Sequence, residues 1–572
     1  MKFFLLLIFL LILPVVYSNE YHIPLLAVKE TTEGFVGSRA DLTLEIQEGN
    51  GRIFLDTYPL TKLDTQMSTR FAKSISCDNV EKDCNDYDFI YTIKANSVIV
   101  GGPSAGAATT LLTISALEQL NLRDDIAITG TINSGGIIGP VGGVKEKIDA
   151  ALDNGIKTVL IPHGENIEVN NSNNTENISL IEYGLREGIE IIEVTTIEEA
   201  LTIATGKIII KENKTLQRSE TYIKTMKLVS EDLCKRTIEL KNNLAKKTLN
   251  EEERNTFENA VNLTKRKEEA IKNEKYYSAA SYCFGANTKL SYLDMLTSNI
   301  TIKDEIKSTK SKIKKAEDII DKKSIKTITD LETYMIVKER LIEAEENLNK
   351  IEEQNNQTDK IYYLSYSIER LNSAISWSAF FNTGEKEFMM NKEELQRSCI
   401  DKISEAEERY EYLGLLLEME FDSTKREIEL AKLDLENQNY ELCLFKASKA
   451  KANSDVILSM MGIEESKLSE VNEKRLEIIK QNIIEEQEKG NFPVVGYSYY
   501  EYANDLKDRD IYSSMLFAEY SLELSNLDMY FKEEQKNIKL NIEISEALIL
   551  LIVFIAGILT GIKIDRVYNK KS

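Results

Sequence analysis

Histidine is scarce in this sequence of 572 residues, which contains only His22 and His163. A Ser-His-Asp triad would have to use His163, in the loop IPHGE after an expected strand, because His22 lies beside the N-terminal apolar segment. The motif HExxH is missing, and the six cysteines are widely spaced with no histidine close by. The sequence therefore indicates neither a metal site nor a cofactor.

Positive charge is also in short supply, with 71 Lys and Arg residues against 94 Asp and Glu residues and a net charge of -23. Such a chain repels phosphate backbones, which argues against nucleic acid as a partner. The Gly-Lys-Ser/Thr ending of a Walker A loop and the motif GxGxxG do not occur. We therefore expect no nucleotide site.

Glycine and proline almost vanish beyond about residue 214. Long charged stretches with apolar residues three and four apart take their place, which predicts helices over residues 215–541. Between about residues 20 and 206, strand-like runs alternate with short helical ones and most of the glycine clusters occur. The expected fold is an α/β (α+β) domain followed by a long all-α region.

A weak motif recurs in the helical region as YYSAASYCFGAN, IYYLSYSIERLN, YELCLFKASKA and IYSSMLFAEYS. Each copy has aromatic or aliphatic residues five apart with small residues between them, and each follows a longer charged helix. This spacing predicts the second helices of repeated helical hairpins. An ordinary bundle of long helices without true repeats is the alternative, and the sequence leaves it open.

Two apolar runs predict the topology. Residues 1–18 have the layout of a signal peptide, with an uncleaved anchor as the alternative. Residues 544–564 are long enough for a transmembrane helix, and the cations around and after this run place the tail, residues 565–572, in the cytoplasm. We therefore expect a single-pass protein of the cell membrane with most of the chain extracytoplasmic.

Disulfides persist in such a compartment, and the six cysteines fall into three neighbouring pairs. These are Cys77 with Cys84, Cys234 with Cys283, and Cys399 with Cys443. Six cysteines allow 15 connectivities, so other pairings stay open. N-x-S/T triplets, such as those in VNNSNNTENIS, suit an exposed loop.

The stretch GGPSAGAATT places Ser104 at the start of an expected helix, as a nucleophile, a phosphate contact or a helix cap. Free N–H groups at a helix start can stabilise an oxyanion, but a serine nucleophile also needs a base. With histidine scarce, a desolvated lysine is the remaining base. The expected helix VKEKIDAALDNG offers Lys147 on its apolar side and Lys145 four residues before Asp149, and either lysine alone is also compatible with a solvated surface charge.

These segments together resemble the proteolytic domain of the Lon proteases, which are serine peptidases with a Ser-Lys dyad. The resemblance covers PSAG, the T-G of AITG, PVGGVxxK and GIKTVLIP, within about residues 20–206. It implies that Ser104 is the nucleophile, that Lys147 rather than Lys145 is the base, and that Thr129 positions the lysine. Gly101 departs from the family, many members of which have an acidic residue three positions before the serine.

The resemblance implies a Lon-like serine protease domain over residues 19–207 and a helical ectodomain over residues 215–541. Without Walker motifs, the chain looks like the secreted or membrane-anchored, ATPase-free Lon-like proteins of archaea. The expected function is ATP-independent hydrolysis of polypeptide substrates by an extracytoplasmic serine endopeptidase. The resemblance also makes a hexamer an expectation, and the helical region is expected to act as a spacer, a docking surface or an oligomerisation element.

The alternative is a catalytically inactive binding or structural protein of the cell surface, built on a Lon-like domain. The presence of Ser104, Lys147 and Thr129 together weighs against that alternative. Self-cleavage that releases or activates the ectodomain is a further hypothesis on which the sequence is silent.

Overall fold

The computed structural model describes residues 20–32, 34–61, 63–80, 82, 84–95, 102–166, 168–170, 177–208, 215–298, 301–417, 421–461, 463 and 465–531. The expected signal peptide (1–18), the expected transmembrane helix (544–564) and the expected tail (565–572) lie outside these residues, as does Gly101. Among the helices that are described, none combines the length and the apolar character needed to cross a bilayer.

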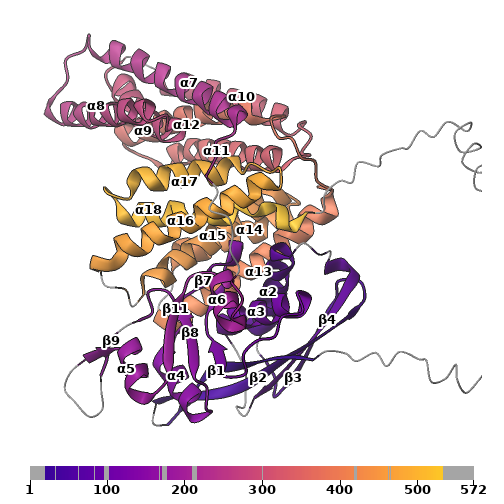
Figure 1. Cartoon of the computed structure of the whole chain (residues 1–572). Coiled ribbons are helices and arrows are strands. Elements are labelled where there is room, and N and C mark those ends of the chain that lie inside the picture. The colour runs from indigo at the N-terminus through magenta and orange to yellow at the C-terminus, as the bar shows by residue number, and fades with distance from the viewer. Residues whose placement is uncertain are drawn as a thin grey trace, which may run out of the picture. The chain divides into compact units, whose positions relative to one another are not determined.

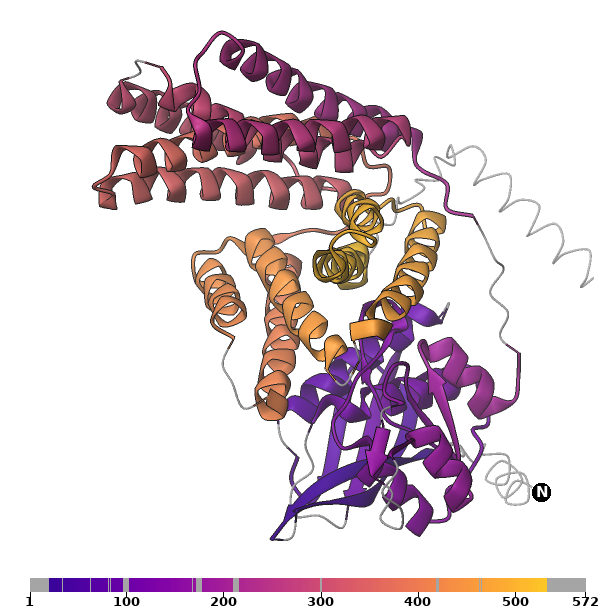
Figure 2. The ribbon, with the colours of Figure 1, turned by 90° about the vertical axis from the view of Figure 1, so that its left-hand side faces the viewer.

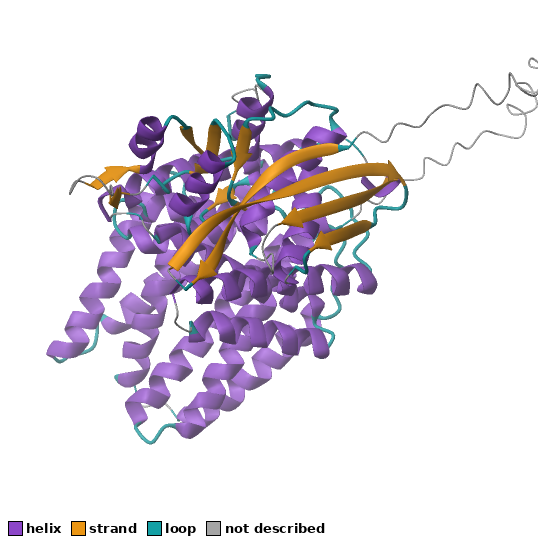
Figure 3. Cartoon of the chain, turned by 90° about the horizontal axis from the view of Figure 1, so that it is seen from below, coloured by secondary structure: helices purple, strands orange, loops and turns teal. Residues whose placement is uncertain are grey.

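The chain begins with a four-stranded sheet in the order β1-β2-β4-β3, seen from below in Figure 3. Its strands are β1 (Tyr21–Thr31), β2 (Gly34–Glu48), β3 (Ile53–Tyr58) and β4 (Tyr87–Ala95). The neighbours β3 and β4 are parallel, with the helix α2 (Leu63–Asn79) as the crossover between them, and the other pairs are antiparallel. Side chains of β2 and β4 that point to one face, among them Leu44 and Phe89, are fully buried.

A second sheet of three parallel strands carries the candidate site at its edge. It consists of β5 (Ile126–Ile128), β8 (Thr158–Pro162) and β11 (Glu190–Val194), with β8 in the centre. The helices around it are α3 (Gly106–Leu117), α4 (Val144–Asp153), α5 (Leu180–Glu187) and α6 (Ile197–Thr205). Two short hairpins complete this part, β6 (Thr131–Ile132) with β7 (Ile138–Gly139) and β9 (Glu168–Asn170) with β10 (Asn177–Ser179).

The rest of the described chain is helical, which confirms the prediction of a mixed α/β part followed by an all-α region (Figure 1). The helices fall into four consecutive groups of three. The groups are α7 (Glu220–Leu244), α8 (Glu251–Lys272) and α9 (Tyr276–Leu296); α10 (Ile302–Ile320), α11 (Ile328–Glu353) and α12 (Gln357–Trp377); α13 (Lys392–Leu417), α14 (Asp422–Glu436) and α15 (Tyr440–Met460); and α16 (Leu468–Glu488), α17 (Val494–Leu506) and α18 (Ile511–Ser525).

The recurring sequence motif lies on the third helix of each group, namely α9, α12, α15 and α18. In every group this third helix packs on both preceding helices, as Figure 2 shows for α13, α14 and α15. The expected repeat of two helices is therefore too short by one helix. The third helix is covered on most sides, which explains why its motif combines aromatic and small residues rather than a single apolar stripe.

Three disulfides join the neighbouring cysteine pairs. Cys77 on α2 is bonded to Cys84 in the turn before β4. The other two bonds each link the first helix of a group to its third, through Cys234 and Cys283 in one group and Cys399 and Cys443 in another. Both bonds skip the middle helix, so they connect the helices of a three-helix unit and not those of a two-helix hairpin.

Buried charges lie where the last two helix groups approach the α/β part. The ammonium groups of Lys402 and Lys451 bind opposite oxygens of the Glu523 carboxylate, at 2.6 and 2.7 Å, and both also pair with Glu405. Lys402, Lys451 and Glu523 are at most 1% exposed. Ser134, from the α/β part, donates a hydrogen bond of 3.3 Å to Glu523. Two lysines and two glutamates thus balance their charges out of contact with water.

Glu523→Gln is expected to destabilise the fold by about 3–5 kcal/mol, because it leaves two buried ammonium groups with one carboxylate. Burial raises the pKa of Glu523, but the charges of Lys402 and Lys451 outweigh burial and hold it at about 2. A depressed carboxyl pKa adds stability above the unfolded value of about 4.3 and loses it as the pH falls toward 2. Urea unfolding at pH 7 and pH 3 measures both effects.

The matched control is Glu477→Gln, which removes an exposed ion pair with Lys480 on the same helix. Such pairs contribute at most about 1 kcal/mol, so this variant is expected to unfold like the wild type. Equal stability of the Glu523 variant and the control at pH 7 would contradict the assigned role of the buried cluster.

Candidate active site

Ser104 lies in a short 3-10 turn, Pro103–Ala105, directly before α3. Its side chain is half-buried, and none of the hydrogen bonds among the described residues engages its hydroxyl. The backbone of this turn is tied to the end of β5, because the Gly130 N–H donates to the Ser104 carbonyl at 3.1 Å and the Ala107 N–H donates to the Gly130 carbonyl at 3.0 Å. The turn therefore presents Ser104 at a fixed place beside β5.

Lys147 lies on α4 and is 3% exposed. Its ammonium nitrogen donates a hydrogen bond of 3.1 Å to the Thr129 hydroxyl. Thr129 is itself buried, and its backbone N–H donates to the carbonyl of Leu160 on β8. Thr129 and Gly130 are adjacent, so this dipeptide contacts the lysine through its first residue and the Ser104 turn through its second. The structure thus links Lys147 to Thr129 by a side-chain hydrogen bond, and the Ser104 turn to the next residue, Gly130, through the backbone.

Lys145 has a different environment. Its ammonium group pairs with Asp149, four residues on, at 2.7 Å and lies 4.9 Å from the centre of the Tyr183 ring. The Lys145 side chain is 30% exposed. These contacts hold Lys145 on the outer side of α4, as the sequence predicts for an i, i+4 pair.

Burial dominates the electrostatics of Lys147. It lowers the pKa of the lysine to about 8, although the carboxylates of Glu165 and Glu146 act in the opposite direction. An amine with this pKa is about half neutral at pH 8, so it can accept a proton under mild conditions.

Glu165 is a residue of this site that the sequence reasoning missed. It follows β8 in IPHGE and faces Lys147, and burial raises its pKa to about 7 against the lysine charge and a hydrogen bond from the Val141 N–H. His163, the residue considered in that loop, pairs instead with Glu193 at 3.8 Å. The available signal was position, because β5 and β8 are parallel neighbours and the residues after them meet at one sheet edge.

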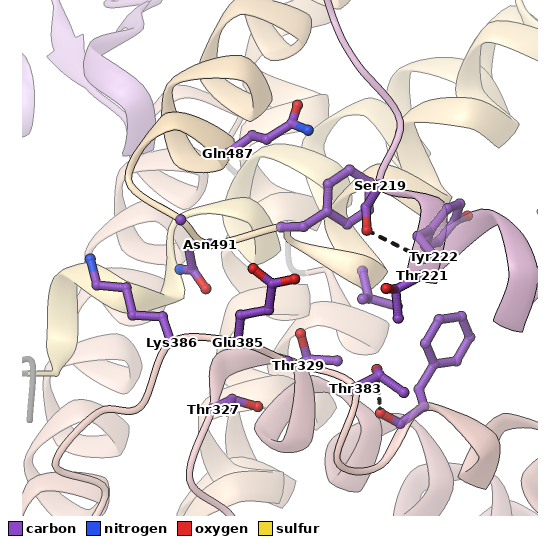
Figure 4. Close-up of a pocket in the computed structure, with 15 residues that line it drawn as sticks. Ser219, Thr221, Tyr222, Thr327, Thr329, Thr383, Glu385, Lys386, Gln487 and Asn491 are labelled. Carbon is purple, nitrogen blue, oxygen red and sulfur yellow. Dashed lines mark hydrogen bonds between the residues drawn. The ribbon is translucent and has the colours of Figure 1, made fainter.

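Two cavities lie away from these residues. One, of about 250 Å³, lies in the helical region and is lined by hydroxyl groups from the starts of α7 and α11 together with Glu385 and Asn491 (Figure 4). The other, of about 490 Å³, lies between α6 and α16 and is rich in glutamate. Neither is lined by Ser104, Thr129 or Lys147. The described residues also contain no cluster of three His, Cys, Asp or Glu residues suited to a metal ion.

Residues 67–207 match the family described as Lon protease (S16) C-terminal proteolytic domain. This segment is similar to the proteolytic domain of Lon proteases. The match confirms the resemblance drawn from PSAG, AITG and PVGGVxxK, and it includes the turn of Ser104, Thr129 and the helix of Lys147.

Relatives of the Lon-like domain point the same way. The chain is 33% identical over 158 residues to a Lon protease of Paraburkholderia phytofirmans, covering 27% of this chain and 18% of the relative. It is 37% identical over 123 residues to the archaeal Lon protease of Pyrococcus abyssi, covering 22% of this chain and 11% of the relative. It is 41% identical over 103 residues to Lon protease 1 of Hydrogenovibrio crunogenus, covering 18% and 12%. The chain thus spans less than a fifth of the length of these relatives.

Glu165→Gln is expected to lower the pKa of Lys147 further below about 8, because it removes the larger of the two carboxylate charges that stabilise the ammonium form. The pKa can be followed by NMR of lysine labelled with carbon-13 at Cε, with Lys147→Arg to assign the signal. Glu187→Gln, at the exposed end of α5 in the same Lon-like domain, is the control and is expected to leave the titration unchanged. A rise in the Lys147 pKa on Glu165→Gln would contradict the assigned contact.

Proposed function

We propose that this protein is a membrane-anchored, extracytoplasmic serine endopeptidase that hydrolyses polypeptides with a Ser104–Lys147 dyad and without ATP. The observation that carries the proposal is the buried Lys147, with its lowered pKa and its hydrogen bond to Thr129, next to the turn of Ser104. The similarity of residues 67–207 to a proteolytic domain supports the same chemistry.

In the proposed reaction, neutral Lys147 takes the proton of the Ser104 hydroxyl as its oxygen attacks the carbonyl carbon of the peptide bond. N–H groups in the turn around Ser104 stabilise the negative oxygen of the tetrahedral intermediate. Lys147 then returns the proton to the leaving amine as the C–N bond breaks, which leaves an acyl-serine. A water molecule, deprotonated by Lys147, hydrolyses this ester and restores the serine.

Thr129 is proposed to orient the lysine. A lysine side chain has four rotatable bonds, and ordering it costs conformational entropy that a hydrogen bond from a rigid partner offsets. Thr129 is rigid because its backbone is bonded to β8. Its hydroxyl oxygen accepts from the ammonium form of Lys147, and its O–H can donate to the neutral form, so the contact persists through the proton transfers.

The other parts of the proposal rest on the sequence. ATP independence follows from the missing Walker A ending, and the membrane anchor from the apolar run 544–564 with the cations around and after it. The relatives carry the name protease, which supports polypeptides as substrates of this chain. The resemblance to Lon proteases is the basis for proposing a hexameric assembly.

Ser104→Ala and Lys147→Ala are each expected to lower the cleavage of an unfolded protein such as casein by at least about 10³-fold, since nucleophile and base act as one unit. Lys145→Ala, on the same helix, is the matched control and is expected to keep most of the activity. The assay compares the purified chains without nucleotide. Loss of activity in the Lys145 variant with retention in the Lys147 variant would overturn the assignment of the base.

Adding ATP and Mg²⁺ to the wild-type assay is expected to leave the rate of casein cleavage unchanged. Activity that required ATP would contradict the proposed independence from ATP.

A fluorophosphonate probe tests whether Ser104 is activated, since it labels an activated serine covalently whether or not the peptide substrate is suitable. Labelling that is absent at every pH in the wild-type chain would instead favour the inactive binding protein.

A further inference from the structure

The segment from Gly130 to Gly143 joins Thr129 to the helix that carries Lys147. Six of its 14 residues are glycine. Gly135, Gly136 and Gly143 adopt positive φ angles, between 67° and 71°, which other residues adopt only with strain. A segment of this composition loses much conformational entropy when it is ordered, so the position of Lys147 depends on the contacts that hold the segment.

The Lon-like domain supplies one set of these contacts, because Ile132, Ile138 and Val141 are buried in its apolar cores. The hairpin of β6 and β7 contains two residue pairs, and the Ile138 N–H donates to the carbonyl of Thr195 at 2.9 Å. Within the hairpin loop, the Asn133 N–H donates to the Ile137 carbonyl. The ends of the segment, near Ile132 and near Gly142, have further partners in the helical region.

Arg409 of α13 holds the first end. Its guanidinium group donates hydrogen bonds of 2.6 Å to the carbonyl of Ile132 and to the side-chain oxygen of Asn133. The same group pairs with Asp455 at 3.1 Å, and both side chains are 3% exposed. The buried ion pair through Nε fixes the direction of the guanidinium, and its Nη2 group binds the segment.

Tyr412, one turn further along α13, holds the second end. Its hydroxyl accepts a hydrogen bond of 2.8 Å from the N–H of Gly142, directly before the residue that caps α4. Residues three apart lie on the same face of a helix, so Arg409 and Tyr412 contact the two ends from one surface.

Between these ends, the segment lies against the helices of the last two groups. Ser134 donates to Glu523 of α18, Gly135 lies so close to Asn482 of α16 that a Cβ atom would be 2.8 Å from its amide nitrogen, and Ile137 belongs to the apolar core of the helical region. The helical region therefore contacts the segment from Ile132 to Gly135, at Ile137 and at Gly142.

Tyr412 also reaches the surroundings of the dyad. Burial and the nearby charge of Glu165 raise its pKa to about 12, and Glu165 in turn faces Lys147. The loop that carries Glu165 is itself in contact with the helical region, because Gly164 packs against Ile463 and Val471.

We propose that the helical region completes the catalytic site, with Arg409 and Tyr412 as positioning residues that hold the segment between Thr129 and α4 and thereby place Lys147 beside Ser104. This inference rests on the proposed function for its effect on catalysis, but its structural part does not. It assigns the helical region a role in the reaction in addition to any role as a spacer or docking surface.

The groups that face the two key side chains define the pH readout. Lys147 faces the Thr129 hydroxyl, the Glu165 carboxylate and Glu146 on its own helix. Tyr412 faces Glu165, the Gly142 N–H and the charge of Arg409. A looser segment lets water reach Lys147, which raises its pKa toward the ordinary value and moves the rise of activity to higher pH.

Tyr412→Phe removes only the hydroxyl that binds Gly142. We expect kcat for a peptide substrate of the full chain to fall about tenfold, with the rise of kcat moved to higher pH, because one buried hydrogen bond is lost. Tyr410→Phe is the matched control, since Tyr410 is half-buried on the same helix and packs beside Ala406 and Ile428.

Arg409→Lys tests the other end of the segment. It keeps a positive charge beside Asp455 but loses the pair of hydrogen bonds to Ile132 and Asn133, and we expect a similar fall in kcat.

Hydrogen exchange followed by mass spectrometry tests the structural part in the Ser104→Ala chain, in which no catalysis is needed. We expect peptides covering residues 137–147 to exchange faster with Tyr412→Phe added than with Tyr410→Phe added. A wild-type kcat and pH profile in the Tyr412 variant, or unchanged exchange, would overturn the inference. A wild-type chain without Ser104-dependent cleavage would overturn the proposed function alone, because the exchange experiment still decides whether α13 holds the segment.

Discussion

The burial of the Lys147 ammonium group is the constraint on which the rest of the candidate site depends. A lysine in water stays protonated at neutral pH and cannot take a proton from a serine. At 3% exposure its pKa falls to about 8, but two carboxylates oppose this effect. The carboxylate with the larger effect is Glu165, whose own pKa is raised by burial to about 7. It is therefore partly neutral near the pH at which the proposed mechanism requires a neutral lysine. The charge of Glu165 therefore opposes the fall in the Lys147 pKa, and the charge of Lys147 opposes the rise in the Glu165 pKa.

The backbone at the end of β5 converts this chemistry into a geometry. Thr129 binds Lys147 and Gly130 binds the turn of Ser104, so a single dipeptide connects the two residues of the proposed dyad. The dipeptide is held in place by β8 through the bond from Thr129 to Leu160. On the side of Ser104, two backbone hydrogen bonds join the dipeptide directly to the turn. On the lysine side the connection passes through a glycine-rich segment, and there the helical region adds hydrogen bonds at Ile132 and Gly142 to the contacts of the Lon-like domain.

Sequence patterns predicted the parts that depend on local order. Helical spacing and the scarcity of glycine predicted the all-α region. Short motifs singled out Lys147 and Thr129, which share a hydrogen bond, and Ser104, whose turn is hydrogen-bonded to Gly130. Glu165 was not predicted, because an acidic residue in a loop after a strand has no sequence spacing that marks it as part of a site. Arg409 and Tyr412 were not predicted for a different reason. Each contacts residues about 270 positions away in the sequence, and no pattern in α13 indicates a contact with Asn133 or Gly142. The three-helix unit was misjudged because only its third helix carries a motif.

The polar character of the contact between the helical region and the Lon-like domain has a physical consequence. An apolar interface can slide by a few ångströms with little loss of burial, because the hydrophobic effect has no direction. Lys402, Lys451 and Glu523 all lie in the helical region, so their ion pairs fix α13, α15 and α18 relative to one another. The hydrogen bond from Ser134 to Glu523 links this cluster to the Lon-like domain. Such a cluster contributes less stability than its attractions suggest, since its desolvation is costly. Across the contact itself, Arg409 and Tyr412 of α13 form directional hydrogen bonds with Asn133 and Gly142, which apolar packing alone would not supply. We therefore interpret the cluster as fixing α13 within the helical region, and these hydrogen bonds as setting α13 against the segment between Thr129 and α4.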